Sequence, residues 1–443
     1  MPATPLPSAA HLDASPAPGA RAARPSRRSR LPRLPERAAF WLVTATLALL
    51  VSASSAPSPI FPVYQQEWGL SATTVTVVFA VYAGTLLLAL LTVGRLSDHL
   101  GRRTVVVAGL VGVLAALAGF LLAGSAGWLV AARAVQGIGT GTAMGALGAW
   151  LLDLGGRRAA LAQTLNGAAP PLGLMLGGLG SGLLVQYAPA PTRLVYAVCA
   201  VLLAVCALAL LAAPEPAPRV PGARASLVPS VRVPAATRPV LGALAPALAG
   251  SWALGGLFIG LGPSIAAGVL GRADHLVGGL VVASLTGTGA LVGVLTRALP
   301  PRRVATAGAV AFLVGPALLV LALQSASTPL FFTASLVSGV GFGAAFQGGL
   351  RAVVATAPPA ERAGVLSAVY VMCYVAFGVP SVVAGLLTPH AGLRTVAEGY
   401  ALLVVLLGAA ALVLSARAAR RTGGAGVPAP RRTPAAAERT ARR

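Results

Sequence analysis

Long apolar stretches alternate with short polar ones between Ala38 and Ser415. Each apolar stretch is about 20 residues long, the length that an α-helix needs to cross roughly 30 Å of hydrocarbon. Twelve such stretches are present, at residues 38–62, 71–94, 104–123, 128–151, 160–186, 193–213, 240–268, 275–299, 303–323, 329–355, 363–388 and 396–416. The pattern predicts an all-α polytopic membrane protein with twelve transmembrane helices.

Composition supports this prediction. Of the 443 residues, 56% are hydrophobic and only 10% are charged, whereas a soluble domain carries about 25% charged residues. The mean hydropathy is +0.83. The chain has 33 basic and ten acidic residues, every basic residue is an arginine, and the net charge is +23. Such a charge fits nucleic-acid binding or a membrane surface, and the positions of the arginines decide between them.

Twenty-nine of the 33 arginines lie in the two terminal segments and in alternate loops between the apolar stretches. Arg193, Arg272 and Arg394 lie in the other loops, and Arg133 lies within the fourth stretch. Basic residues concentrate in cytoplasmic loops, so both termini are predicted to be cytoplasmic in a multi-pass protein of the cell inner (plasma) membrane. The charge then reports topology and attraction to an anionic lipid bilayer, and we expect no nucleic-acid partner.

The polar segments divide the chain. Residues 1–37 and 418–443 are rich in Ala, Pro and Arg without apolar periodicity, which predicts disordered cytoplasmic tails. Residues 214–239 form the longest internal polar stretch and separate a first six-helix bundle, 38–213, from a second, 240–417. We therefore interpret 214–239 as a cytoplasmic linker.

Internal repeats support two equivalent bundles. Gly94–Leu100 is echoed by Gly293–Leu299 after 199 residues, Gly137–Ala143 by Gly339–Ala345 after 202, and Arg158–Ala159 by Arg362–Ala363 after 204. Three matches at nearly one offset indicate a duplicated six-helix unit with the same orientation in each half.

An alternative reading concerns the N-terminus. Residues 26–31 and 51–56 resemble a twin-arginine signal and its cleavage site. Cleavage there would leave eleven spans and would move every later loop to the wrong side of the charge rule. The twelve-span reading is preferred for that reason.

The turn between the second and third stretches carries the most specific motif, Gly94-Arg-Leu-Ser-Asp98-His99-Leu-Gly101-Arg102-Arg103. It resembles the signature loop of the major facilitator superfamily, G-x-L-[SAD]-D-[RK]-x-G-R-[RK], and departs from it only at His99. Gly94 is expected to let one helix approach another closely, and Gly101 to permit a tight turn. The resemblance implies a gating loop in which Asp98 contacts the N-terminus of the eleventh span, near residues 361–364, where the helix dipole favours an anion. Asp153, near the end of the fourth span, is grouped with this loop.

The fourth stretch contains Arg133, Gln136, Gly137 and Gly139, which resemble the superfamily motif R-x-x-Q-G-x-G. An arginine in the bilayer needs a partner or a wet cavity. Arg133 lies only five residues from Trp128, so the alternative is that its side chain reaches the outer surface.

Four of the spans carry candidate residues for a binding cavity. In the fifth, Pro170 and Gly173 fit the pattern G-P-x-x-G-G of superfamily exporters, although Ala169 and Leu174 depart from it. A helix kinked by proline would serve an importer equally well. The candidate cavity residues are Asn166, Pro170, Trp252, Gln347, Tyr370 and Tyr374. Tyr370, Tyr374 and Phe377 share one helix face, an arrangement that is also common in protein cores.

The sequence lacks motifs for catalysis, metal binding or cofactor binding, which argues against an enzyme. Cys199, Cys206 and Cys373 lie in apolar runs and suit core packing, and no motif predicts a catalytic residue, a metal site or a cofactor. No carboxylate lies in the middle of a stretch, so no proton carrier is evident.

The resemblance implies a secondary active transporter, not an enzyme, that works by alternating access. We expect a monomer that exports small apolar or cationic compounds in exchange for protons. Uptake of a sugar or metabolite is the alternative. A membrane-embedded enzyme acting on lipid-linked substrates is a remote one, because the outer loops are short and hold few acids.

Overall fold

The computed structural model describes residues 34–216, 220–229, 231–272, 274–299, 301–358 and 361–423, and in this part of the chain every regular element is a helix. The first half contains α1 (Glu36–Ser55), η1 (Ser58–Ile60), α2 (Phe61–Trp68), α3 (Ala72–Val93), α4 (Ser97–Leu100), α5 (Arg102–Leu121), α6 (Ala126–Asp153), η2 (Gly156–Arg158), α7 (Ala159–Tyr187) and α8 (Leu194–Leu210). The second half, after η3 (Ala225–Leu227), contains α9 (Arg238–Gly255), η4 (Gly256–Leu261), α10 (Gly262–Gly268), α11 (His275–Leu295), η5 (Thr296–Ala298), α12 (Pro301–Gln324), α13 (Thr328–Ala355), α14 (Arg362–Ala391) and α15 (Leu393–Gly423).

The prediction of twelve spans in two bundles is confirmed. Within the described residues, ten helical runs are long and apolar enough to cross a membrane, with 36–68 and 238–268 each counted as one run. α8 is a shorter apolar helix of 17 residues. α6 has 28 residues and completes the set; it packs against α3 and α5, and its glycines and Arg133 lower its hydropathy.

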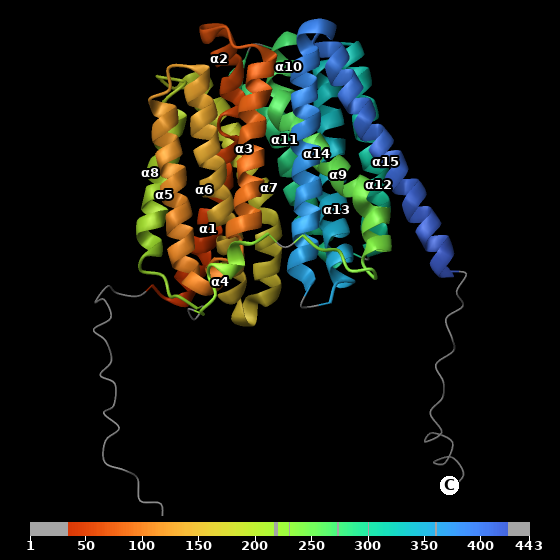
Figure 1. The fold of residues 1–443 in the computed structure, drawn as a ribbon. Coiled ribbons are helices and arrows are strands. Elements are labelled where there is room, and N and C mark those ends of the chain that lie inside the picture. The colour runs from red at the N-terminus through yellow and green to blue at the C-terminus, as the bar shows by residue number, and fades with distance from the viewer. Residues whose placement is uncertain are drawn as a thin grey trace, which may run out of the picture.

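The two halves form adjacent bundles, the first in red to yellow-green and the second in green to blue (Figure 1). Each half has its own apolar core. Phe40, Leu147 and Trp150 are buried in the first, and Phe258 and Phe331 in the second. Across the boundary, α7 packs against α11 and α3 packs against α14. The functional residues are therefore positioned by two cores and one seam between them.

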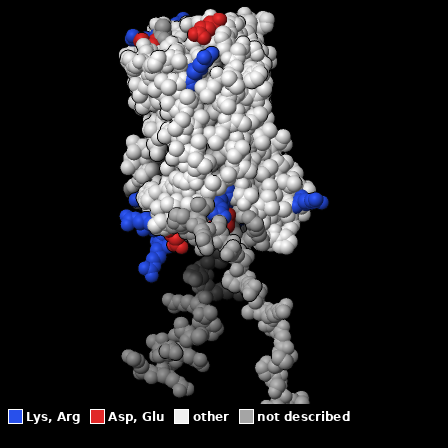
Figure 2. Space-filling model, turned by 90° about the vertical axis from the view of Figure 1, so that its left-hand side faces the viewer, with Lys and Arg blue, Asp and Glu red and all other residues white. Residues whose placement is uncertain are grey.

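Charged side chains gather at the two ends of the bundle, as Figure 2 shows for one face. The broad band between these ends shows no charged side chain on that face. Leu88, Val111 and Leu291 are among the large apolar side chains that remain exposed. An uncharged apolar band is what a lipid-facing surface requires.

The helix ends differ slightly from the predicted boundaries. α1 begins at Glu36, two residues before the predicted start at 38. α15 continues to Gly423, beyond the predicted start of the tail at 418. The rest of the predicted tails, 1–33 and 424–443, lies outside the described residues. The described parts of the linker contain one short helix, η3. The division into tails, bundles and linker at these boundaries stays a prediction.

Candidate functional site

The first span is interrupted by prolines. α1 ends at Ser55, and Pro57 and Pro59 follow before α2 resumes the direction of the chain. Proline has no N–H, so the carbonyls of Ala53 and Ser55, four residues earlier, lose their usual helical donors. Residues 53–56 are buried, and a buried carbonyl without a donor is costly.

Side chains from two other spans supply donors to this break. Gln136 Nε2 donates to the Ala53 carbonyl at 2.9 Å, and Arg133 Nη1 donates to the Ser54 carbonyl at 3.0 Å. Arg133 Nη1 also donates to Gln136 Oε1 at 2.9 Å. From α7, Ser181 Oγ donates to the Ala56 carbonyl at 2.6 Å. The arginine and glutamine of the motif therefore hold the broken first span against α6.

Arg133 lies in the packed interior of the first bundle, with 1% of its surface exposed. Its guanidinium carbon is 5.2 Å from the ring centre of Tyr82, 5.6 Å from Phe61 and 6.0 Å from Phe120. Among the described residues it forms no ion pair, and its Nε has no hydrogen-bond partner. Carbonyls and aromatic rings stabilise the cation instead, and the side chain does not reach the outer surface as the alternative requires.

The motif glycines allow α6 to approach its neighbours. A Cβ on Gly139 would lie 2.7 Å from the Gly109 carbonyl of α5, and one on Gly137 would lie 2.5 Å from the Tyr82 carbonyl of α3. Side chains at these positions would force the helices apart. The close packing brings Arg133 and Gln136 to the break in the first span.

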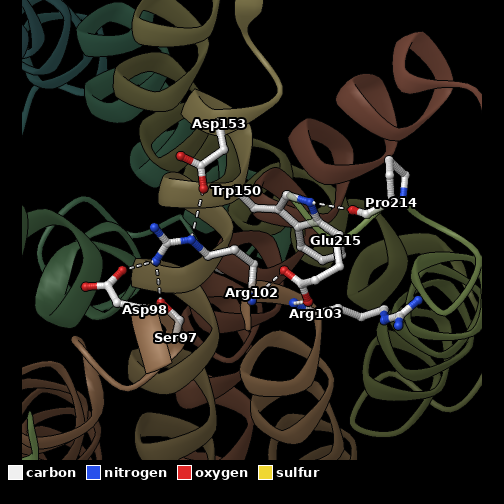
Figure 3. A network of polar contacts seen from close by, with 8 residues as sticks. All are labelled: Ser97, Asp98, Arg102, Arg103, Trp150, Asp153, Pro214 and Glu215. Atoms are coloured by element: carbon white, nitrogen blue, oxygen red, sulfur yellow. Dashed lines mark hydrogen bonds and ion pairs between the residues drawn. The ribbon is translucent and has the colours of Figure 1, made fainter. Parts of the chain in front are cut away.

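Arg102 is the centre of a polar network at the opposite end of the bundle (Figure 3). Its Nε donates to Asp153 Oδ2 at 3.0 Å, and its Nη1 donates to Ser97 Oγ at 2.7 Å and to Asp98 Oδ1. Arg102 therefore joins the signature loop to Asp153 at the end of α6.

Glu215, at the start of the linker, is a residue that the sequence analysis missed. Its Oε1 and Oε2 accept from the backbone N–H groups of Arg102 and Arg103, both at 2.9 Å, and so close the N-terminus of α5 (Figure 3). Gly101 precedes this turn with φ +91°, and a Cβ there would lie 2.9 Å from Glu215 Oε2. The available signal was an acid between two prolines directly after the sixth span.

Two expectations for the signature loop are corrected. Asp98 does not contact the start of α14 in this structure; its carboxylate pairs with Arg102, and its side chain is 54% exposed. The backbone of Arg232 lies there instead, with its N–H 3.4 Å from the Gly364 carbonyl. The space beside Gly94 is limited by Leu90 of the same helix, so no other helix approaches at this glycine.

Three of the candidate cavity residues meet in an aromatic cluster between the two bundles. The ring centre of Trp252 lies 4.6 Å from Tyr374, 6.5 Å from Tyr370 and 5.9 Å from Phe377. Phe377 in turn lies 4.7 Å from Phe79 of the first half. Neither tyrosine hydroxyl has a hydrogen-bond partner among the described residues, so both are available to another group.

The remaining candidates are not in this cluster. Asn166 Oδ1 lies beside Gly148 of its own bundle, and Pro170 lies within α7, which stays helical through it. Gln347 packs against Gly293 and reaches toward Gly167 of the other half, 3.8 Å from the Cβ position there. Of these three residues, Gln347 is the one whose described contacts reach the other half.

A family model described as the Major Facilitator Superfamily matches residues 41–300. The chain belongs to this superfamily. It is therefore a multi-pass membrane transporter rather than an enzyme. A search of curated proteins finds no match to the sequence.

Solved structures of superfamily transporters share the fold. A bacterial homologue of the human lysosomal transporter Spinster, in an inward-facing, unoccupied conformation, has a TM-score of 0.70 at 16% identity, over 86% of this chain and 97% of that one. The human organic anion transporter MFSD10 has a TM-score of 0.61 at 20% identity, over 86% and 100%. The peptide transporter POT has a TM-score of 0.68 at 16% identity, over 85% and 94%. At these identities the likeness shows the fold alone.

Proposed function

We propose that this transporter works by alternating access in the cell inner membrane, with both termini in the cytoplasm, and exports small apolar or cationic compounds in exchange for protons. The observation that carries the proposal is the aromatic cluster of Trp252, Tyr370 and Tyr374 between the two halves. A substrate held there would be released when the halves move relative to one another.

The chemistry of the cluster favours this substrate class. Aromatic faces attract organic cations and apolar ring systems, and the two unpaired hydroxyls offer donors to a polar group. A sugar would need several convergent polar side chains, whereas Trp252, Phe346 and Phe377 surround the cluster with apolar surface.

The proton as coupling ion, the direction of export and the monomeric state come from the resemblance to superfamily exporters. Asp98 and Asp153 lie near span ends, and within the described spans Arg133 is the only charge found deep in a helix. The carrier of the proton is therefore open to experiment.

Transport into inverted vesicles under an imposed pH gradient, acid inside, tests the proposal. A planar aromatic cation should accumulate in the vesicles, and collapse of the gradient should release it. Trp252→Ala should weaken its binding about 2- to 30-fold, which corresponds to the range of a cation–π contact. Trp128→Ala is the matched control, because it removes a half-exposed indole near the start of α6, away from the cluster. Release of a preloaded sugar from the vesicles, driven by the same gradient and without accumulation of the cation, would overturn the proposal in favour of uptake.

A further inference from the structure

His99 is the one position at which the signature loop departs from the superfamily pattern, and it contacts the linker. Its Nδ1 lies 3.2 Å from the carbonyl oxygens of Val220 and of Pro221. Its own carbonyl accepts from the Val220 N–H at 3.2 Å. Gly222, with φ +112°, lies against the ring, and a Cβ there would be 3.3 Å from Cε1. Because carbonyls only accept, Nδ1 carries the proton in this arrangement.

The start of the linker is fixed to the first half by further contacts. Glu215 closes α5, and Trp150 Nε1 donates to the Pro214 carbonyl at 3.1 Å. Arg103 Nη1 donates to the Leu211 carbonyl at 2.8 Å. From Pro214 to Pro221, the described residues of the linker therefore lie on the first bundle, with His99 at the far end of the contact.

The end of the linker is fixed to the second half. The Arg232 N–H lies 3.4 Å from the Gly364 carbonyl, and a Cβ on Gly364 would lie 3.1 Å from the Arg232 carbonyl. Thr237 Oγ1 donates to the Thr356 carbonyl at 3.3 Å. Since α14 begins at Arg362, the linker backbone occupies the first turn of α14, where the resemblance places Asp98 when the cytoplasmic side is closed.

The hydrogen bonds that join the two halves directly lie at the opposite end. Within the described residues they are Thr73 Oγ1 to the Gly385 carbonyl at 2.9 Å, Ser264 Oγ to Gln65 Oε1 at 3.1 Å and His275 N–H to Gln186 Oε1 at 2.8 Å. They lie at the end of the bundle that holds α2 and α10, away from α4 (Figure 1). Toward the cytoplasmic end, the described hydrogen bonds that link one half to the other run through the linker.

We propose that the linker is a docked strap that must leave the first turn of α14 before Asp98 can reach it, and that His99 is the positioning residue that holds the strap. The inference rests on the alternating-access function proposed above. Docking of the strap favours the state that is open to the cytoplasm, because the strap covers the surface needed for closure. Loss of the His99 contact shifts the population toward the state that is closed on the cytoplasmic side.

The test uses the full chain in lipid nanodiscs. Hydrogen exchange at Val220 and Arg232 reports docking, and the distance between spin labels at Arg157→Cys and Arg351→Cys, both exposed at the cytoplasmic end, reports closure. His99→Leu should speed exchange at both amides and raise the ratio of short to long distances about 2- to 10-fold, the effect of one hydrogen bond. His99→Asn places an amide N–H where Nδ1 lies and should restore the wild-type ratio.

Two further variants keep the test independent of His99. Thr237→Val removes the hydrogen bond to the Thr356 carbonyl without changing the loop or the first turn of α14, and should shift the distance ratio in the same direction as His99→Leu. His390→Leu, an exposed histidine at the other end of α14, is the matched control and should change neither readout.

The outcomes separate two failures. Unchanged hydrogen exchange at Val220 in His99→Leu would show that His99 does not hold the strap. Faster exchange with an unchanged distance ratio would overturn the gating role of the strap. A single distance population in every variant would instead remove the premise of alternating access, and the proposed function with it.

Discussion

The first and seventh spans occupy equivalent places in the two halves, and both are interrupted, but in different ways. In α1–η1–α2 the break is made by Pro57 and Pro59, which remove backbone donors. In α9–η4–α10 the chain passes through a π-helix at Gly256–Leu261 without a proline inside it. A π-helix pairs its backbone groups with residues five positions away, and Pro263, which lacks an N–H, follows it only at the start of α10.

The residues of α13 that are equivalent to Arg133 and Gln136 are short and face two other helices, α11 and α12. Counting 202 residues on from Arg133 and Gln136 gives Ser335 and Ser338. Ser335 Oγ pairs with Ser284 Oγ at 2.5 Å, and Ser338 Oγ has no partner among the described residues. The two long donors therefore stand at the break that contains prolines, where Gln136 pairs with the carbonyl that Pro57 leaves without a donor, and the comparison assigns the R-x-x-Q motif first to holding the broken span.

The largest expected effect is that of Arg133→Ala. The change removes the donor to the Ser54 carbonyl and leaves a hole among three aromatic rings. We expect the free energy of unfolding to fall by about 2–4 kcal/mol and transport to be lost. Ser335→Ala, at the equivalent position, should cost about 1 kcal/mol or less. Thermal unfolding in detergent and vesicle transport measure both.

Arg133→Lys completes this comparison. Nη1 alone donates to Ser54 and Gln136, and an ammonium could donate twice as well. It lacks the planar guanidinium that lies over the rings of Tyr82 and Phe61, so we expect partial transport only. Full transport by the lysine variant would contradict a specific role for the guanidinium. Equal losses for Arg133→Ala and Ser335→Ala would contradict the difference between the halves.

A double-mutant cycle between Pro57 and Gln136 tests the cause of the break. Pro57→Ala restores an N–H that can pair with the Ala53 carbonyl, which now accepts from Gln136 Nε2. Gln136→Leu should therefore cost about 1 kcal/mol less in the Pro57→Ala background than in the wild type. Additive unfolding energies would show that the glutamine does not compensate for the proline.

Glu215→Gln tests how much the two hydrogen bonds from the α5 N-terminus to the Glu215 carboxylate contribute to stability. The amide has one acceptor oxygen for two backbone N–H groups and no charge at the helix N-terminus. We expect a loss of about 0.5–2 kcal/mol and faster hydrogen exchange in the first turn of α5. Glu361→Gln is the control in the other half, because Glu361 precedes α14 without a side-chain capping bond. Equal effects of the two changes would contradict a special clasp in the first half.

The smallest effect is expected for Ser338→Ala. Its hydroxyl is buried and has no partner within the described residues, so the change should lie within about 0.5 kcal/mol of zero or stabilise slightly. A clear loss of stability would reveal a partner for Ser338 and would weaken the contrast with Gln136. Thermal unfolding of the single variant is sufficient.

The sequence by itself determined the twelve spans, and it predicts the orientation of the loops and the duplication of the halves. Each depends on properties that are local along the chain: the length of an apolar run, the side on which arginines fall, and the spacing of repeated motifs. It also gave Tyr370 and Tyr374 as candidates, because aromatic residues at helical spacing are visible without the fold, whereas Trp252 was a candidate because the resemblance places the seventh span at the cavity.

Only the tertiary structure decided which groups meet. Gln136 and the Ala53 carbonyl are 83 residues apart, and Glu215 and the Arg102 N–H are 113 apart. No local pattern specifies such pairs, because they depend on how closely the helices pack and on where the linker lies. For the same reason the sequence could not show that in this structure Asp98 pairs with Arg102 while the backbone of Arg232 lies at the first turn of α14. Hydropathy determines which segments cross the bilayer. Which side chains bond across neighbouring segments is determined by the need to pair buried polar groups.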